Sequence, residues 1–316
     1  MVKKKSAQRR SAQRAPKLPA EGSAEAGSPR RAPVAAPQRL WATVRSWWPL
    51  LAVAAALSTL AVVAVARTDD GRDDATREGA SRGIEHFDVR VLHAYPHDPE
   101  AFTQGLLWHE RHLFESTGQY GASSVRKVVL TTGEVLQRRN DDAMMFGEGL
   151  ARVRDRLVQL SWMEHVAHVW SLRDLAPVRT FEYEGEGWGL CFDGAQLVMS
   201  NGSDRLVFRD PETFAVVRSV RVRDGRGSVD QLNELECVDG VVWANVWQTD
   251  RIVRIDPRDG RVTGIVDASG LLTEPERAQA DVLNGIAWIP ERRHFVLTGK
   301  LWPRTFEVEF VPRETR

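Results

Sequence analysis

The chain has no excess of either charge. Its 316 residues include 43 Lys and Arg and 43 Asp and Glu, so the formal net charge at pH 7 is zero. A neutral balance argues against the phosphate backbone as a main partner, and we expect no nucleic-acid binding. The sequence also lacks a P-loop, a nucleophile elbow and a dinucleotide-binding fingerprint, so none of these three sites is predicted.

Metal-binding patterns are missing as well. The eight histidines show no spacing that pairs them with a cluster of carboxylates or cysteines. The sequence therefore predicts no metal site and no cofactor.

Cysteine is scarce, with Cys191 and Cys237 as its two occurrences. They begin similar tetrapeptides, Cys-Phe-Asp-Gly and Cys-Val-Asp-Gly, which places them at like positions of neighbouring sequence repeats. An exported protein could join them in a disulfide. We favour two buried free thiols, because equivalent points on neighbouring repeats of a ring diverge from its axis and would be too far apart for disulfide geometry.

The charges that are present are unevenly placed. Residues 1–46 carry eleven Lys or Arg against Glu21 and Glu25, which leaves the remainder net acidic by nine. This arm is rich in Ala, Pro, Ser and Gln and cannot bury a core. We expect it to be a disordered basic arm on the cytoplasmic side of a membrane.

An apolar segment follows at residues 47–67. Trp47 and Trp48 precede 18 uncharged residues, 49–66, which would span about 27 Å as a helix, close to the roughly 30 Å hydrocarbon core. With the basic flank inside, we expect a transmembrane anchor and a periplasmic or extracellular remainder. Cleavage at the small residues 64–66 would instead make the segment a signal peptide and the protein secreted.

Residues 68–83 lack periodicity and are predicted to form a linker to one globular domain at 84–316. β-Branched residues dominate this domain and long helical periods are absent. Five polar or aromatic residues precede strand starts at intervals of 44, 40, 45 and 51 residues: Gln104, Glu148, Trp188, Asn233 and Asn284. This period predicts an all-β fold, a five-bladed β-propeller. A β-sandwich could use similar strands, but the fixed period argues against it.

The last repeat lacks its fourth strand. It ends after residues 306–310, whereas the alternating residues 87–92 precede the first repeat and belong to none. We predict that residues 87–92 supply the missing strand, because closing the ring removes two exposed sheet edges.

Equivalent positions of a propeller surround one axis, so the five leading residues should face one another. A second set follows them at offsets of 14 to 16 residues: Gly118, Trp162, Gly202, Trp247 and Lys300. Together the two sets predict a pocket with aromatic walls, one carboxylate, one lysine and several amides, which is the composition of a site for a small polar ligand.

These residue types also have structural interpretations. Tryptophans in strand repeats are commonly core, and a lone Glu or Lys is commonly solvated. Glu148, however, lies between Gly147 and Gly149, which suggests close backbone approach. Nearby aromatic rings would desolvate its carboxyl and raise its pKa, which suits proton transfer near neutral pH. Lys300 at the mouth could stabilise a developing oxyanion.

Longer motifs resemble those of the plant- and bacterial-type glutaminyl-peptide cyclotransferases. The resemblance covers about residues 86–310 and is carried by motifs that include Phe102-Thr103-Gln104-Gly105-Leu106, Phe146-Gly147-Glu148-Gly149-Leu150, Asn233-Glu234-Leu235-Glu236, Ala244-Asn245-Val246-Trp247 and Leu283-Asn284-Gly285-Ile286. It implies a five-bladed propeller that cyclises an N-terminal glutamine to pyroglutamate and releases ammonia.

Carried over by motif, the resemblance implies that Glu148 transfers the proton during cyclisation and that Lys300 is a second catalytic group. Asn233, Gln104 or Lys300 would stabilise the oxyanion. The substrate-binding residues that it implies are Phe102, Gln104, Phe146, Trp162, Trp188, Asn233 and Trp247.

Two other classes of protein could use the same fold. A non-catalytic propeller that binds peptide N-termini or sugars would have a similar aromatic, amide-lined mouth. A metal-dependent hydrolase or lactonase would need a ring of histidines and carboxylates, whereas this ring contains one Glu. We expect a monomeric enzyme whose partners are peptides or proteins with an N-terminal glutamine, with the membrane as a further partner through the N-terminal segment.

Overall fold

The computed structural model describes residues 83–314. The predicted basic arm, the predicted anchor and residues 68–82 of the predicted linker lie outside the described residues. Among residues 83–314, no helix has the length and apolar character needed to cross a membrane. The described part is all-β apart from the short helix α1 (Glu274–Arg277).

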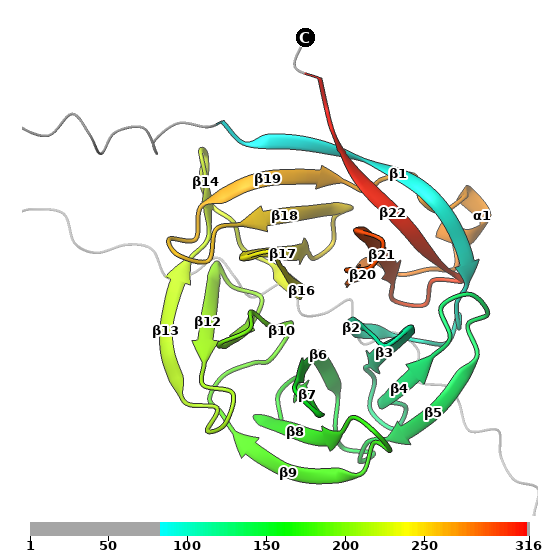
Figure 1. The fold of residues 1–316 in the computed structure, drawn as a ribbon, viewed down its shortest axis with the longest axis vertical. Helices are drawn as coiled ribbons and strands as arrows, with labels where there is room; N and C mark the ends of the chain where they lie inside the picture. Colours follow the sequence, from blue (N-terminus) through cyan, green and yellow to red (C-terminus); the bar gives the residue numbers. More distant parts are fainter. Residues whose placement is uncertain (1–82, 315–316) are drawn as a thin grey trace, which may run out of the picture. The chain divides into compact units, whose positions relative to one another are not determined.

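Most strands pair antiparallel with the next strand of the chain, and the resulting sheets follow one another around a ring (Figure 1). The first sheet contains β2 (Thr103–His109), β3 (His112–Thr117), β4 (Ser124–Val128) and β5 (Val135–Asn140). The second contains β6 (Gly147–Val153), β7 (Arg156–Ser161), β8 (Val166–Ser171) and β9 (Pro177–Glu182). The third contains β10 (Leu190–Phe192), β11 (Leu197–Met199), β12 (Arg205–Arg209) and β13 (Val216–Arg221).

The remaining strands form an eight-stranded sheet and a small hairpin. In spatial order, the eight strands are β16 (Leu232–Val238), β17 (Val241–Val246), β18 (Arg251–Ile255), β19 (Val262–Asp267), β1 (Glu85–Pro96), β22 (Arg304–Pro312), β21 (His294–Gly299) and β20 (Leu283–Ile289). The hairpin pairs β14 (Arg223–Asp224) with β15 (Gly227–Ser228). Strands β2, β6, β10, β16 and β20 lie nearest the middle of the ring in Figure 1.

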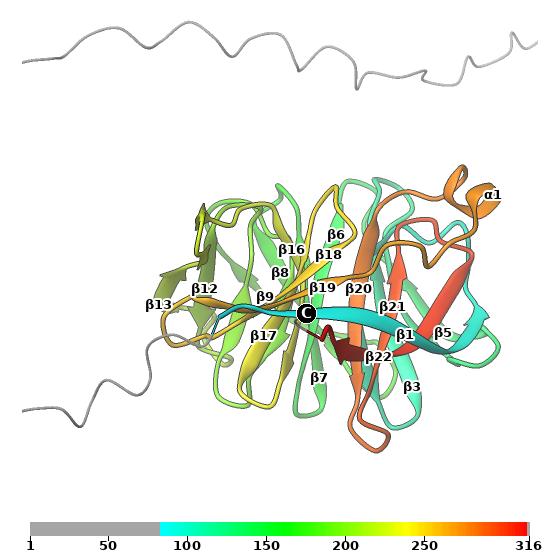
Figure 2. The ribbon, with the colours of Figure 1, turned by 90° about the horizontal axis from the view of Figure 1, so that it is seen from above.

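The burial of the strands follows their place in the ring. Strand β2 is mostly buried on both faces, whereas β5 at the outside is mostly exposed. The core lies between neighbouring sheets, where Val158 and Leu160 of β7 pack in one cluster with Leu190 and Leu197 of the third sheet. Turned by 90°, the ring shows strands running between its two faces, with turns at both (Figure 2). The ends of the innermost strands therefore gather on common faces.

The ring is closed by β1. It pairs antiparallel with β22 from Phe87↔Pro312 to Pro96↔Arg304, so residues 87–92 complete the last repeat as predicted. The same strand also pairs in parallel with β19, from Glu85↔Gly264 to Asp88↔Asp267. This second pairing was not predicted. It joins the sheet of β16–β19 to that of β20–β22 and leaves neither of the two edges open.

Glycine allows the innermost strands to approach one another closely. A Cβ atom added at Gly149 would lie 2.5 Å from the backbone N of Leu190, and one at Gly189 would lie 2.0 Å from the backbone O of Asn233. Both separations are far below van der Waals contact. Because only glycine lacks this atom, the backbones of neighbouring sheets can meet near the axis.

Glu234 ties three innermost strands together. Its side chain is fully buried, and its Oε1 accepts a hydrogen bond from the Leu106 amide of β2 at 3.2 Å. Its Oε2 accepts one from the Ile286 amide of β20 at 2.8 Å. Burial raises the pKa of the Glu234 carboxyl well above its ordinary value, an effect to which Glu236 adds and which the two amides oppose. No pattern in the sequence indicates this bridging role.

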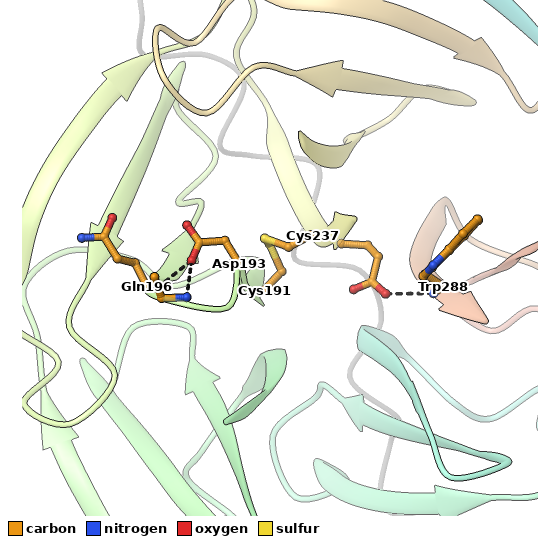
Figure 3. Close-up of a disulfide and its surroundings, with 7 residues drawn as sticks. Cys191, Asp193, Gln196, Cys237 and Trp288 are labelled. Carbon is orange, nitrogen blue, oxygen red and sulfur yellow. Dashed lines mark hydrogen bonds between the residues drawn. A yellow bond between two sulfur atoms is a disulfide. The ribbon is translucent and has the colours of Figure 1, made fainter. Parts of the chain in front are cut away.

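Cys191 and Cys237 form a disulfide, so the prediction of two free thiols was wrong (Figure 3). The bond joins β10 to β16, and the two Cα atoms are 5.5 Å apart. The prediction assumed that equivalent positions of neighbouring repeats diverge. The innermost strands instead stand side by side near the axis, as the contact of Gly189 with Asn233 demonstrates. At this radius like positions fall within disulfide reach.

Candidate active site

Glu148 lies at the start of β6, between the two glycines that the sequence singled out, and is 4% exposed. Its Oε1 accepts a hydrogen bond from Gln104 Nε2 at 2.8 Å. Burial raises the pKa of its carboxyl well above the ordinary value of 4.5, with Lys300 opposing the shift and Glu186 and Glu164 adding to it. A carboxyl with a raised pKa is better suited to take a proton and return it during a reaction than an ordinary one.

A chain of side-chain amides orients Glu148. Asn284 Nδ2 donates to Gln104 Oε1 at 3.1 Å and to the Thr103 carbonyl at 3.0 Å. Because Gln104 Oε1 accepts from Asn284, its Nε2 is the atom presented to Glu148. Three of the leading residues predicted to face one another, Gln104, Glu148 and Asn284, are therefore linked by hydrogen bonds.

Lys300 directly follows β21 and is buried, which rules out the interpretation as a solvated surface lysine. Its Nζ lies 4.8 Å from the centre of the Phe102 ring, within cation–π range. Burial lowers the pKa of Lys300, while the charges of Glu148 and Asp281 oppose that shift. The charge of Lys300 lowers the pKa of Glu148, and the charge of Glu148 raises that of Lys300.

The turn that carries Lys300 is fixed to the segment that carries Phe102. The Leu301 amide donates to the Ala101 carbonyl at 2.7 Å, and His97 Nδ1 lies 2.7 Å from the Trp302 carbonyl oxygen. The other ring nitrogen of His97 lies 3.0 Å from Glu115 Oε1. Burial alone would lower the pKa of His97, but the charge of Glu115 and the Trp302 carbonyl raise it overall. The sequence did not identify this support.

Aromatic rings form a continuous run beside the acid. The centroids of Phe102 and Phe146 are 6.0 Å apart, and those of Phe146 and Trp162 are 5.6 Å apart, in edge-to-face arrangements. Tyr120, which the sequence did not single out, adds a contact to Phe146 at 5.4 Å. Phe102, Phe146 and Trp162 are therefore packed against one another in one row, which we call the aromatic wall.

Trp188 and Trp247 form a second aromatic pair, with centroids 5.5 Å apart and planes at 83°. The two indole N–H groups of Trp162 and Trp188 both donate to Glu186 Oε2, at 2.8 Å and 2.9 Å. Sequence reasoning missed Glu186, which lies outside the strands. Its one available signal was its position two residues before Trp188.

The two glycines of the second set, Gly118 and Gly202, make room for aromatic rings. A Cβ atom at Gly118 would lie 2.4 Å from Phe146 Cε1, and one at Gly202 would lie 2.7 Å from Trp188 Cζ2. The second set of positions therefore alternates between residues that form the wall and glycines against which the wall packs.

Asn233 lies on β16, and Trp188 lies just before β10 of the third sheet. Its backbone carbonyl accepts a hydrogen bond from Ser200 Oγ at 2.7 Å. Its side chain is 3% exposed, and Oδ1 has no hydrogen-bond partner among residues 83–314. Within residues 83–314, no hydrogen bond joins the side chains of Asn233 and Glu148, and the role of Asn233 as an oxyanion donor stays a prediction. Residues 83–314 also contain no group of three or more His, Cys, Asp or Glu side chains placed to hold a metal ion.

The comparisons with known proteins agree with the sequence motifs. A sequence model of the family "Glutamine cyclotransferase" matches residues 57–310. A glutaminyl-peptide cyclotransferase of Arabidopsis thaliana is 44% identical over 239 residues, which cover 73% of this chain and 74% of that protein. The crystal structure of Myxococcus xanthus glutaminyl cyclase is similar with a TM-score of 0.67 and 40% identity, and covers 73% of this chain and all of that one. This chain therefore belongs to the glutamine cyclotransferase family.

Proposed function

We propose that this protein converts the N-terminal glutamine of peptides and proteins to pyroglutamate and releases ammonia. Membership of the family supports the reaction. The observation that carries it is the buried Glu148 carboxyl, which is oriented by Gln104 and coupled to a buried Lys300. An acid with a raised pKa beside a cationic group is suited to proton transfer during aminolysis of an amide.

The reaction joins two groups of the same residue. The α-amine attacks the side-chain amide carbon, a C–N bond forms, and the C–N bond to the leaving ammonia breaks. Because the attack is intramolecular, holding the reactive rotamer supplies much of the acceleration. The aromatic wall of Phe102, Phe146 and Trp162 is suited to hold the short side chain and exclude water.

Glu148 is proposed to take a proton from the attacking amine and return it to the leaving nitrogen, so no net proton remains on the enzyme. The carbonyl oxygen carries negative charge in the tetrahedral intermediate. Lys300, Gln104 and Asn233 are the candidate donors to this oxyanion, and one such donor typically contributes a few kcal/mol. Lys300 is supported among these candidates by its charge, which lowers the pKa of Glu148.

Direct cyclisation tests the proposal. The full-length protein is mixed with a peptide that begins with Gln and with the same peptide acetylated on its α-amine, and products are read by mass spectrometry. We expect loss of one ammonia from the free peptide and no change in the acetylated one, because its amine cannot attack. A folded protein that binds the free peptide without releasing ammonia would favour a non-catalytic binding module.

Replacing Lys300 by Met should change both the rate and its pH dependence. Loss of one oxyanion donor lowers kcat by roughly 10²–10³-fold. The positive charge of Lys300 lowers the pKa of Glu148, so its removal raises that pKa. As the ionised Glu148 is the base, the rising limb of kcat/KM against pH should move to higher pH.

Rates measured across pH for the Lys300→Met and Lys127→Met variants check this expectation. Lys127 lies on β4 with its Nζ over the Phe114 ring, and it does not contribute to the pKa of Glu148. Its loss should leave the profile in place. If the rising limb does not move in Lys300→Met, the charge of Lys300 does not affect the protonation of Glu148.

We also propose that residues 84–316 form one five-bladed catalytic propeller. The three four-stranded sheets supply three blades. The order of the eight-stranded sheet supports two more, one of β16–β19 and one of β20–β22 with β1, joined where β1 meets β19.

The location of the enzyme is a further proposal. Residues 47–67 would anchor it with the basic arm of residues 1–46 inside and the catalytic domain outside the cytoplasm, and the protein would act as a monomer. The Cys191–Cys237 disulfide supports an oxidising compartment. Cleavage of the segment would give a secreted form instead.

A further inference from the structure

Glu186 occupies an unusual position beside the site. It lies on the segment between β9 and β10, and it is neither a strand residue nor one of the residues implied by the family motifs. One of its oxygens, Oε2, accepts a hydrogen bond from the indole of Trp162 at 2.8 Å and another from the indole of Trp188 at 2.9 Å. Hydrogen bonds to an ionised carboxylate are shorter and stronger than neutral ones.

We propose that Glu186 is a positioning residue for the cyclisation reaction, because its carboxylate holds the indole rings of Trp162 and Trp188 in the places from which they enclose the substrate. The inference rests on the proposed function.

The two indoles come from different sheets. Trp162 directly follows β7 of the second sheet, and Trp188 precedes β10 of the third. A single oxygen of Glu186 therefore joins the sides of the site across the boundary between two sheets. Trp162 continues into the wall through Phe146, and Trp188 continues through Trp247. Fixing the rings of Trp162 and Trp188 therefore also restrains Phe146 and Trp247, which pack against them.

Glu164 repeats the arrangement on the neighbouring part of the wall. Its Oε1 accepts from the Tyr120 hydroxyl at 2.9 Å, and its Oε2 accepts from the Phe146 amide at 3.4 Å. Glu164 thus fixes the part of the wall that contains Tyr120 and Phe146, whereas Glu186 joins Trp162 to Trp188. Of the two, Glu186 has the closer contacts and makes both with tryptophan side chains that are predicted to bind the substrate.

Glu186 also acts on the acid through its charge. The ionisable groups around Glu148 are Lys300, Glu186, Glu164, Tyr120 and Tyr183. A nearby negative charge disfavours the ionised carboxyl, so Glu186 raises the pKa of Glu148. Removing that charge lowers the pKa, and the rising limb of activity should move to lower pH. This shift is opposite to the one expected for Lys300→Met.

Two substitutions separate positioning from charge. Glu186→Gln removes the charge but keeps a carbonyl oxygen with two lone pairs, which can accept both indole N–H groups as Oε2 does. Glu186→Ala removes the charge and the acceptor. We expect both variants to shift the limb to lower pH, and only Glu186→Ala to lose kcat/KM, by roughly 100-fold, because small misplacements of the substrate have effects of that size.

Glu184→Gln is the matched control. Glu184 is exposed on the same segment, two residues before Glu186, so the variant makes the same charge change away from the indoles. It should match the parent in rate and pH profile. The indole N–H signals in nitrogen-15 NMR spectra of the full-length protein supply a readout independent of turnover. Those of Trp162 and Trp188 should move in Glu186→Ala and stay close to the parent positions in Glu184→Gln.

Three outcomes would overturn the inference. One is an unchanged kcat/KM in Glu186→Ala, and a second is an equal loss in the Ala and Gln variants at their own optimal pH, which would leave charge as the cause. The third is a large loss of kcat/KM in Glu186→Gln, and this variant decides the matter if Glu186→Ala does not fold. Absence of turnover in the parent would overturn the proposed function and the inference with it, whereas an active parent with any of the three overturns the inference alone.

Discussion

Glu148→Gln should lose kcat by roughly 10²–10⁴-fold, the contribution that a positioned acid–base group typically makes. The fold should be unaffected, because the new amide oxygen can still accept the hydrogen bond from Gln104 Nε2 that Glu148 Oε1 accepts at 2.8 Å. Release of ammonia from a Gln-initiated peptide measures the rate. Glu184→Gln, with the same charge change at an exposed site, should keep the parent rate.

The same variant has an expected stability profile. Burial raises the pKa of Glu148 in the folded protein above its ordinary value of 4.5. Below the ordinary pKa the carboxyl is protonated in both states, and pH has no effect through this group. As pH rises above it, the unfolded chain ionises first and the parent loses stability until the folded pKa is reached. Glu148→Gln lacks this loss, so denaturant unfolding should find it at least as stable as the parent at neutral pH. Appreciable turnover in this well-folded variant would remove Glu148 from the mechanism.

Removing the disulfide should lower the free energy of unfolding by about 4 kcal/mol, which is the chain-entropy value for a loop of this length. Cys191 and Cys237 are 46 residues apart in the chain. The double variant Cys191→Ala, Cys237→Ala makes the change, and thermal unfolding under non-reducing conditions measures it. For a domain of this size, the loss corresponds to a melting temperature roughly 8–16 °C lower.

Reduction of the parent provides the control. A thiol reductant should lower the parent melting temperature toward that of the double variant and leave the variant itself unchanged. If the parent and the double variant unfold alike without reductant, the bond does not contribute to the stability of the native protein.

The sequence predicted the repeat, its closure by residues 87–92 and the proximity of three leading residues. The leading residues Gln104, Glu148 and Asn284 are in hydrogen-bonded contact, because a constant period places equivalent positions around one axis. Residues 87–92 complete the last sheet. This pairing was predictable, because a strand outside the repeats and a repeat without its fourth strand are both visible as departures from the period.

The features that the sequence did not predict depend on distances that no repeat period specifies. Prediction of the disulfide would have required the distance between the innermost strands, which is set by the backbone contact between Gly189 and Asn233. Glu234 accepts from amides 128 and 52 residues away, and any residue type supplies a backbone amide. Glu186 lies in a segment without strand periodicity, so its contacts with two indoles follow from the path of that segment alone.

The double pairing of β1 determines the order in which the domain can fold. The strand is made before every other strand of the described part, yet Phe87 pairs with Pro312 and Glu85 pairs with Gly264, both near the far end of the chain. Contacts of such long sequence separation form late, because the entropy of closing the loop must be overcome first. The first three sheets can assemble from neighbouring strands as synthesis proceeds. The first strand to emerge is therefore the last to be paired, and its edges stay open to other chains until synthesis is almost complete.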